Sequence, residues 1–425
     1  MDDTRPRWRF SWWWVVIAAV GGIVIAFTLW MRADSDLAAA DARARGLGVA
    51  TTWAERGLVL SPANQLNDWN RIHQLGKALH SYRSTYEAWR FPPLGSPLPP
   101  ELAAHHAALP ANDLVELSQL AGGIVPTTPR VSLDISSLLP ELESGRELSK
   151  LYQELTALAT PDHVAARSAE HLAIICADPA VSLIQGLVAT SRISIWAQSF
   201  TWHLGNHGID RQTLAAQCDA ARLWLEQTGI DSWVSEYIVM RDLAQRIVDG
   251  DPKYSHGLLQ GLGLPGWLDT LRLGRPMIRL SRGKLLAFNL DMVEAWSKHA
   301  TAAGRVAAFR LVATRMEKLN RWDPRNRLVQ ELGAACGMVA RSWAEADTHL
   351  RLLAAELRGE PWPIDPTDPA GKPVRRIERD GRLIGFYLLK DGTDDGGHTS
   401  KDKCTALYEP LGKPMAADPL VSDPP

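Results

Sequence analysis

The stretch RQTLAAQCDAARLWLEQTGIDSWVSEYIVMRDLAQRIVDG, from Arg211 to Gly250, decides the fold class, because its apolar residues recur at helical spacing. Asp210 stands where a helix N-cap is expected, and Gly229 stands where a glycine closes a helix. Asp231 is then placed to cap a second helix that ends just before Gly250. The stretch therefore predicts two consecutive helices.

Helical spacing continues on both sides of this stretch. Before it, helical blocks cover residues 61–89, 147–160, 163–177 and 181–204, the first opened by Ser61 and Pro62. After it, two long helices are predicted, from Leu290 to about residue 319 and from Pro324 to about residue 358. Segments rich in proline and glycine, 91–146 and 251–276, interrupt the pattern and predict loops or short helices.

The pattern changes after Gly359. The runs VRRIER and RLIGFYLL have β-type composition and are joined by Asp380-Gly381, a dipeptide that strongly favours a two-residue hairpin turn. The last residues, 410–425, hold five prolines and predict a disordered tail.

At the N-terminus, SWWWVVIAAVGGIVIAFTLW, Ser11 to Trp30, contains no charged residue. Twenty helical residues span the roughly 30 Å hydrocarbon core of a bilayer, and tryptophans at both ends are typical of interfacial anchors. A cleaved signal peptide is the alternative, but its apolar region is usually only about 7–15 residues long. Arginines before the segment favour a cytoplasmic N-terminus, residues 1–10, and a periplasmic body anchored in the inner membrane by one pass.

The sequence as a whole predicts a mainly α protein with three parts. They are an N-terminal transmembrane helix (11–30), an antiparallel helical-bundle ectodomain (31–358) and a small C-terminal β-hairpin module (359–409). The chain has 425 residues and a net charge of −2 without a basic stripe, which argues against nucleic-acid binding as its main role. No P-loop and no hydrolase or zinc-protease motif occurs.

The four cysteines leave the redox state open. An oxidising compartment would allow two disulfides in three connectivities, whereas Cys176 and Cys336 lie in apolar runs typical of small core residues. The other two are Cys218 and Cys404.

Two groups of residues in the helical body are candidates for a site. His203, His207 and Asp210 lie close together in HLGNHGID, with Glu236 further on, and could serve a metal site or an enzyme. A helix end that uses histidine favourably is the alternative. Four tryptophans could line an apolar groove or fill the core: Trp196, Trp202, Trp224 and Trp233.

The stretch GFYLLKDGTDDGGHTSKD, Gly385 to Asp402, combines carboxylates with glycines. Calcium prefers six to eight oxygen ligands, and carboxylates with backbone carbonyls can supply them. The sequence therefore predicts a possible calcium site of structural role at Asp391, Asp394, Asp395 and Asp402. A solvated turn after a strand uses the same residue types and remains the alternative.

Two resemblances add expectations. The segments DPAVSLIQGLVATSRISIWA and SEYIVMRDLAQRIVDG resemble uncharacterised planctomycete-type single-pass helical membrane proteins. Residues 345–402 resemble the C-terminal module of type II secretion pseudopilins, with Asp368, Pro369, Gly371 and Pro373 in the turn. That resemblance implies a calcium-binding loop starting at Asp391 and Gly392. The chain lacks the pseudopilin leader and the glutamate of its mature helix, so the likeness implies a shared module only.

These observations predict a membrane-anchored envelope protein of structural or interaction type, with protein partners in the envelope and no catalytic activity. Two alternatives stay open: a hydrolase-like envelope enzyme with a site in the helical body, and a ligand-binding helical module.

Overall fold

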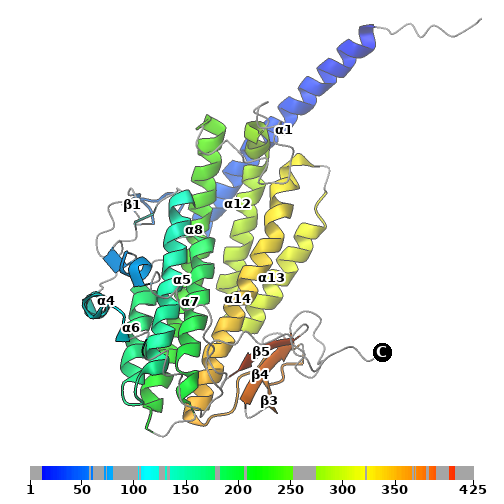
Figure 1. The fold of residues 1–425 in the computed structure, drawn as a ribbon. Helices are drawn as coiled ribbons and strands as arrows, with labels where there is room; N and C mark the ends of the chain where they lie inside the picture. Colours follow the sequence, from blue (N-terminus) through cyan, green and yellow to red (C-terminus); the bar gives the residue numbers. More distant parts are fainter. Residues whose placement is uncertain are drawn as a thin grey trace, which may run out of the picture. The chain divides into compact units, whose positions relative to one another are not determined.

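The structure is a computed structural model, and it is mainly helical (Figure 1), as predicted. It describes residues 12–56, 59–60, 71–72, 74–79, 104, 107–123, 130–131, 135–177, 182–204, 208–251, 274–320, 323–365, 368, 370–379, 382–388 and 402–406. The chain forms two compact units. Unit 1 comprises residues 1–51, 237–291 and 315–333, and unit 2 comprises residues 52–236, 292–314 and 334–425.

Unit 2 contains an antiparallel helical bundle. Its first helices are α5 (Ile135–Leu158), α6 (Val164–Ala177), α7 (Leu183–Ser199) and the first part of α8 (Arg211–Asp249). Short connections join them, and α5, α6 and α7 pack against one another. The indole of Trp196 in α7 donates to the carbonyl of Ser168 in α6, and the indole of Trp224 in α8 donates to the carbonyl of Cys176. The predicted bundle is thus confirmed for these helices.

Helix α8 corrects the prediction of two helices. It runs without a break from Arg211 to Asp249, so Gly229 does not end a helix and Asp231 does not cap one. The predicted start and end are confirmed. Asp210 accepts a bond from the backbone N–H of Thr213 at 3.0 Å, and Gly250 adopts φ +91° just past the end.

Gly229 is instead required by packing. A Cβ atom at this position would lie 2.2 Å from Cζ2 of Trp296, and one at Gly186 would lie 2.8 Å from Cζ2 of Trp343. These indoles belong to an aromatic cluster with Trp233 and Phe309, whose ring centroids lie between 4.9 and 6.3 Å apart. The glycines therefore give room to large side chains of other helices, which a local sequence pattern does not reveal.

The helices after residue 273 also differ from the prediction. α12 spans Gly274–Lys298 and α13 spans Ala302–Glu317, so the expected helix from Leu290 starts earlier and breaks at residues 299–301. Thr301 accepts from the backbone N–H of Gly304 and starts α13. The second expected helix is confirmed as the short 3-10 turn η3 (Pro324–Asn326) followed by α14 (Arg327–Arg358), which stops at Gly359 with φ +72°.

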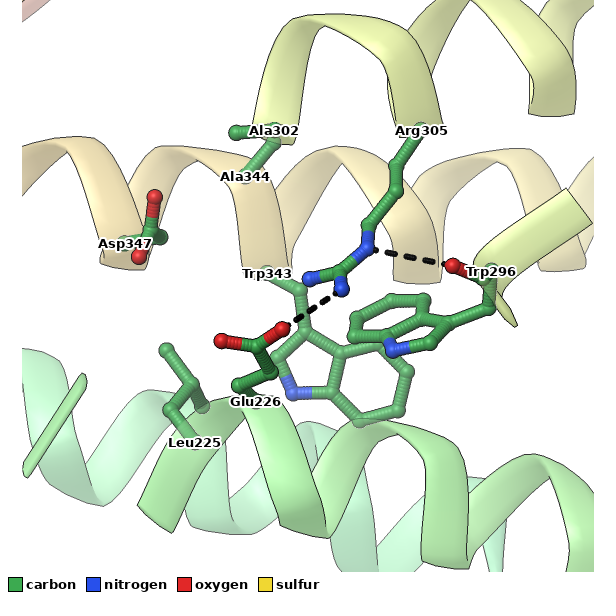
Figure 2. A pocket seen from close by; sticks show the side chains of 8 residues that line it. All are labelled: Leu225, Glu226, Trp296, Ala302, Arg305, Trp343, Ala344 and Asp347. Carbon is green, nitrogen blue, oxygen red and sulfur yellow. Dashed lines mark hydrogen bonds and ion pairs between the residues drawn. The ribbon is translucent and has the colours of Figure 1, made fainter. Parts of the chain in front are cut away.

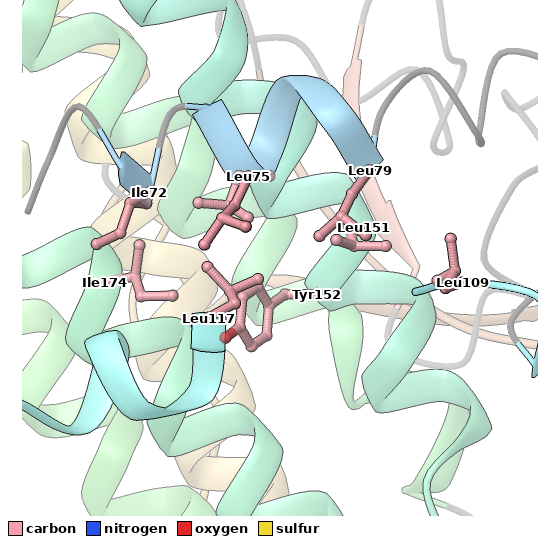
Figure 3. Packing of buried hydrophobic residues seen from close by; sticks show 9 residues of the cluster. Ile72, Leu75, Leu79, Leu109, Leu117, Leu151, Tyr152 and Ile174 are labelled. Carbon is pink, nitrogen blue, oxygen red and sulfur yellow. The ribbon is translucent and has the colours of Figure 1, made fainter. Parts of the chain in front are cut away.

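A second core in unit 2 contains buried side chains of α5 and α6 (Figure 3). Helical residues 71–72 and 74–79 and α4 (Ala111–Gly123) supply part of it. Its buried members are Ile72, Leu75, Leu79, Leu109, Leu117, Leu148, Leu151, Tyr152 and Ile174. The segment 91–146, for which loops or short helices were predicted, therefore contains α4 and the first turns of α5. Two short strands, β1 (Val59–Leu60) and β2 (Arg130–Val131), pair in parallel.

After α14 the chain forms a turn and a sheet. In the turn, the Asp368 carboxylate accepts a hydrogen bond from the backbone N–H of Ala370 at 2.7 Å, and Gly371 has φ +65°. Arg375 reaches back to the same carboxylate at 2.9 Å. β3 (Arg375–Arg379), β4 (Arg382–Leu388) and β5 (Asp402–Ala406) form an antiparallel sheet in that order. The turn residues Asp380 and Gly381 lie outside the described residues.

Unit 1 is built around α1 (Trp12–Gly46), the last part of α8 and the first part of α12. Ala244, Ile247 and Ile278 form an apolar cluster between the last two. Among the side chains that the structure describes, no helix combines the length and apolarity needed to cross a bilayer. The predicted span lies partly beyond that set, because Ser11 and the side chains of residues 12–19 are not described.

Candidate functional site

The first half of α1 has an exposed apolar face. Val20, Val24, Phe27 and Met31 follow one another at intervals of four, three and four residues, so they share one side of the helix. Each is more than half exposed, with Phe27 highest at 65%. No other described segment carries so many large exposed apolar side chains so close together. We call these four residues the apolar stripe.

The second half of α1 is packed closely against α12. Ala33, Ala40 and Ala44 are buried, and their small side chains allow a neighbouring helix to approach. A Cβ atom on Gly283 of α12 would lie 2.6 Å from the backbone of Asp36 and Leu37. The two helices therefore meet backbone to backbone, and only glycine fits at the crossing.

Paired charges follow the same contact. Asp34 accepts hydrogen bonds from Arg279 at 2.8 Å and from Arg282 at 3.2 Å. The bond from Arg279 lowers the pKa of this carboxyl, against a smaller opposing effect of burial. The guanidinium of Arg279 also lies 3.8 Å above the ring of Trp30, a cation–π contact.

Asp41 joins α1 to the last part of α8. Its carboxylate accepts from the Tyr237 hydroxyl at 2.8 Å and from Arg241 at 3.0 and 3.1 Å. Burial opposes ionisation of Asp41, but the bonds from Arg241 and Tyr237 outweigh it and lower the pKa. Asp41 is thus held as a carboxylate at neutral pH.

Three more ion pairs join the second half of α1 to other helices of unit 1. Asp36 lies 3.1 Å from Arg325 and 3.8 Å from Lys284. Arg43 lies 2.6 Å from Asp291 and also donates to the carbonyl of Ala287. The second half of α1 is therefore held by ion pairs to the other helices of unit 1 along its whole length. Among the described residues, no helix covers the apolar stripe that precedes it.

Unit 2 contains a separate surface cleft (Figure 2). Its empty space, counted out to open solvent, is about 340 Å³. The lining residues come from α8, α12, α13 and α14: Leu225, Glu226, Trp296, Ala302, Arg305, Trp343, Ala344 and Asp347. Figure 2 shows the guanidinium of Arg305 between the carboxylate of Glu226 and the indole of Trp296.

Each charged side chain that lines the cleft has an ion-pair partner. Arg305 donates to Glu226 at 2.8 Å and to the carbonyl of His299 at 2.8 Å, and it lies 4.5 Å from the Trp296 ring centroid. Asp347 accepts from Arg351 at 2.8 Å. Arg305 thus closes the end of α12, whose carbonyls it binds.

The predicted histidine and glutamate residues are not brought together as a reactive group. His203 lies in the 3-10 turn η2 (Thr201–His203), is buried, and its Nε2 lies 2.9 Å from the carbonyl of Thr156. Burial lowers its pKa. Glu236 accepts from the N–H of Leu183 at the first turn of α7, and burial raises its pKa. Asp210 is a helix cap, and His207 lies outside the described residues.

The described tryptophan side chains act in packing. Trp196 and Trp233 are fully buried, and Trp224 bonds to the backbone of α6. The side chain of Trp202 is not described. Packing in the core, one of the two predicted alternatives, is therefore the role of these three.

The predicted calcium ligands lie only partly within the described residues. Asp391, Asp394 and Asp395 lie outside the described residues, and Asp402 is the first residue of β5. In the part of the chain that is described, no three histidine, cysteine or acidic side chains are grouped to hold a metal ion. Cys176 and Cys218 are free thiols, whose pKa values burial raises.

Sequence reasoning missed the arginines that hold α1. Arg241, Arg279 and Arg282 lie far along the chain from their acidic partners. One signal was available: Arg275, Arg279 and Arg282 recur at intervals of four and three residues and so mark one basic face of a helix.

The geometry defines a helical protein whose first helix exposes an apolar stripe and packs its second half against other helices of unit 1. No protein-family model, no curated protein and no solved structure matches the chain.

Proposed function

We propose that the protein is a membrane-anchored envelope protein of structural or interaction type, with residues 11–30 as its single anchor. The observation that carries this proposal is the apolar stripe on α1. Burying one large aliphatic or aromatic side chain is worth about 1.5–3 kcal/mol, so four exposed neighbours favour a nonaqueous environment strongly. A bilayer fits best, because the uncharged segment has the length that spans it.

The way α1 is attached supports an anchoring role. The paired charges of Asp34 and Asp41 fix the second half of the helix to unit 1, so a membrane-embedded first half would hold the body at the surface. Arginines at positions 5, 7 and 9 favour an N-terminus in the cytoplasm and a body in the periplasm. Protease added to spheroplasts is then expected to digest the body and spare the N-terminal ten residues.

An interaction role is favoured over catalysis by the state of the polar groups. Arg305 and Glu226 in the cleft neutralise each other, and His203 is engaged with backbone in the core. The partners we propose are other envelope proteins, which the body would hold near the membrane.

The anchor is tested by extracting membranes at alkaline pH. The full chain is expected to stay in the pellet. The variant Val20→Asp, Val24→Asp places two carboxylates near the middle of the segment, where each costs about 2.5–3.5 kcal/mol, and is expected in the supernatant. The matched control is Leu223→Asp, Leu311→Asp, which changes two equally exposed leucines of unit 2. Retention of the first variant, or release of the control, would refute the anchor.

A bound calcium ion at the loop from Asp391 to Asp402 is a second part of the proposal, supported by residue types and by the resemblance to pseudopilin modules. Calcium at 100 times its Kd should stabilise the chain by about 2.7 kcal/mol. The melting temperature of the full chain is expected to rise with calcium over chelator, and to stop doing so in Asp391→Ala, Asp394→Ala. Asp162→Ala, at an exposed turn, serves as the control. Equal melting temperatures in calcium and chelator would leave the loop a solvated turn.

A further inference from the structure

The point where the apolar stripe ends is marked by an aromatic ring and by arginines. Trp30 is partly exposed and carries the guanidinium of Arg279 on its ring, and Arg32 follows it in an exposed position. Buried positions begin at Ala33. Tryptophan and arginine at the end of an apolar helical segment are typical of the bilayer interface.

Helix α12 places a further arginine near the end of the apolar stripe. Arg279, Gly283 and Asp291 meet successively later residues of α1, namely Asp34, Asp36 and Arg43, so the two helices run in the same direction within unit 1. Arg275 precedes Arg279 by four residues, about 6 Å along the helix axis. It therefore lies on the side of the exposed half of α1.

The local acids do not cancel these charges. Asp34 is shared by Arg279 and Arg282. Arg275 donates to the carbonyl of Gly250, and among the described residues no carboxylate lies within ion-pair distance of Arg275 or Arg32. The group as a whole therefore keeps a positive charge.

The sequence of unit 1 has the same sign. It holds 19 lysines and arginines against 13 aspartates and glutamates, a surplus of 6. The whole chain holds 46 against 48, so unit 2 holds 27 against 35. The unit that carries the apolar stripe is thus the basic one, which complements an anionic surface.

We infer that Arg32, Arg275 and Arg279, the arginine collar, bind the phosphate groups of anionic phospholipid headgroups where α1 leaves the bilayer. Guanidinium groups bind phosphate through paired N–H donors, and Arg279 is already oriented by Trp30 and Asp34. The inference rests on the proposed anchor, because the bilayer places the headgroups at the collar. The headgroup phosphate, rather than free phosphate, is the ligand.

The test uses the full chain in two kinds of vesicle, phosphatidylcholine alone and phosphatidylcholine with a minor share of phosphatidylglycerol. Flotation with the neutral vesicles reports the anchor. The lipid that stays with the protein after mild detergent extraction reports the collar. We expect the wild-type chain to float with both vesicles and to retain phosphatidylglycerol several-fold above its share in the mixture.

The variant Arg32→Gln, Arg275→Gln is expected to float equally well but to lose this enrichment. It leaves the bond between Arg279 and Asp34 intact and removes one hydrogen bond of the fold, from Arg275 to the Gly250 carbonyl, so an unchanged melting temperature is checked first. Adding Arg279→Gln should remove any remaining enrichment. The control Arg310→Gln, Arg315→Gln, Lys318→Gln removes exposed charges elsewhere and should keep the enrichment.

Each other result decides against one proposal. Flotation without enrichment, or enrichment that survives in the triple collar variant, overturns the collar and leaves the anchor standing. Loss of enrichment in the control means that only overall charge matters, which also overturns the collar. Enrichment abolished by inorganic phosphate at constant ionic strength would make this a free-phosphate site instead. No flotation with neutral vesicles overturns the anchor, and if anionic vesicles also fail, the collar falls with it.

Discussion

The interior of unit 2 and the contact between α1 and the rest of unit 1 are stabilised in different ways. In unit 2, Trp196, Trp233 and Trp343 are fully buried, and glycines make room for Trp343 and for Trp296 beside it. In unit 1, alanines and a glycine bring helix backbones together, and partly exposed arginine–aspartate pairs line the contact. The comparison teaches that the first region depends on shape and the second on charge.

The two regions should therefore respond to different perturbations. Burial of large aromatic side chains excludes water and gives a free energy that depends steeply on volume. Partly exposed ion pairs contribute roughly 0–1 kcal/mol each and weaken with salt. Volume changes should be felt most in unit 2, and changes of charge or salt in unit 1.

The largest effect is expected from Gly229→Ala. The added methyl would overlap the ring of Trp296 at 2.2 Å, so the free energy of unfolding should fall by about 3 kcal/mol, in spite of the better helix propensity of alanine. Urea denaturation measures this. Gly145→Ala is the matched control in the same unit, because its methyl would meet nothing closer than 3.6 Å. Equal stability of the two variants would break the shape argument.

The next effect concerns pH in unit 2. His171 is completely buried, stacks on Tyr152 at 5.2 Å, and has no hydrogen-bond partner for either ring nitrogen among the described residues. Burial, aided by the charge of Arg192, holds its pKa well below the usual value. The unfolded chain therefore binds one more proton than the folded chain at acid pH. The contribution of His171 to the free energy of unfolding is fully present above about pH 6.5, and it falls by up to about 1.4 kcal/mol for each pH unit below that value.

Unfolding followed from pH 8 to 5 in wild type and His171→Phe isolates this contribution. The raised pKa of Glu236 acts with the opposite sign from about pH 4.5 upward, and it is common to both proteins, so their difference reports His171 alone. Tyr152→Phe is the control, because burial raises the pKa of that hydroxyl away from this range. Parallel pH curves for wild type and His171→Phe would contradict the prediction.

A smaller effect is expected from Asp41→Asn in unit 1. The amide loses the charge that Arg241 and Tyr237 bind, and unfolding free energy should fall by about 1–2 kcal/mol, less in high salt. The pKa of Asp41 is lowered in the fold, so this contribution is present above the unfolded pKa and is lost as the pH falls through the folded value. Asp242→Asn, which breaks a pair within α8, should cost only about 0.3–0.5 kcal/mol. A salt-independent loss at Asp41 would argue for packing rather than charge.

The smallest effect is expected at the rim of the cleft in unit 2. Glu226 is half exposed, so Glu226→Gln should change stability by less than about 1 kcal/mol, although it leaves Arg305 without its carboxylate. Arg305→Met should cost more, because Arg305 also binds the carbonyls of Trp296 and His299. If the two variants lose equal free energy of unfolding, the ion pair with Glu226 accounts for the contribution of Arg305, and its bonds to the end of α12 add nothing.

The sequence predicted the helices well where the signals were local. The cap at Asp210 and the stops at Gly250 and Gly359 depend on neighbouring residues, and each is found. The prediction failed at Gly229 because glycine is used there for packing against a residue 67 positions away. It also missed the break between α12 and α13, although the cap at Thr301 is local and Arg305 binds carbonyls only six and nine residues before it.

What the sequence by itself determined is the helical class, the ends of several helices and the uncharged segment at the N-terminus, since periodicity, capping and hydropathy are properties of adjacent residues. Only the tertiary structure decided which aspartate pairs with which arginine and where the exposed part of α1 ends. Asp34 and Arg279 are 245 positions apart, and such partners are chosen by the packing of whole helices.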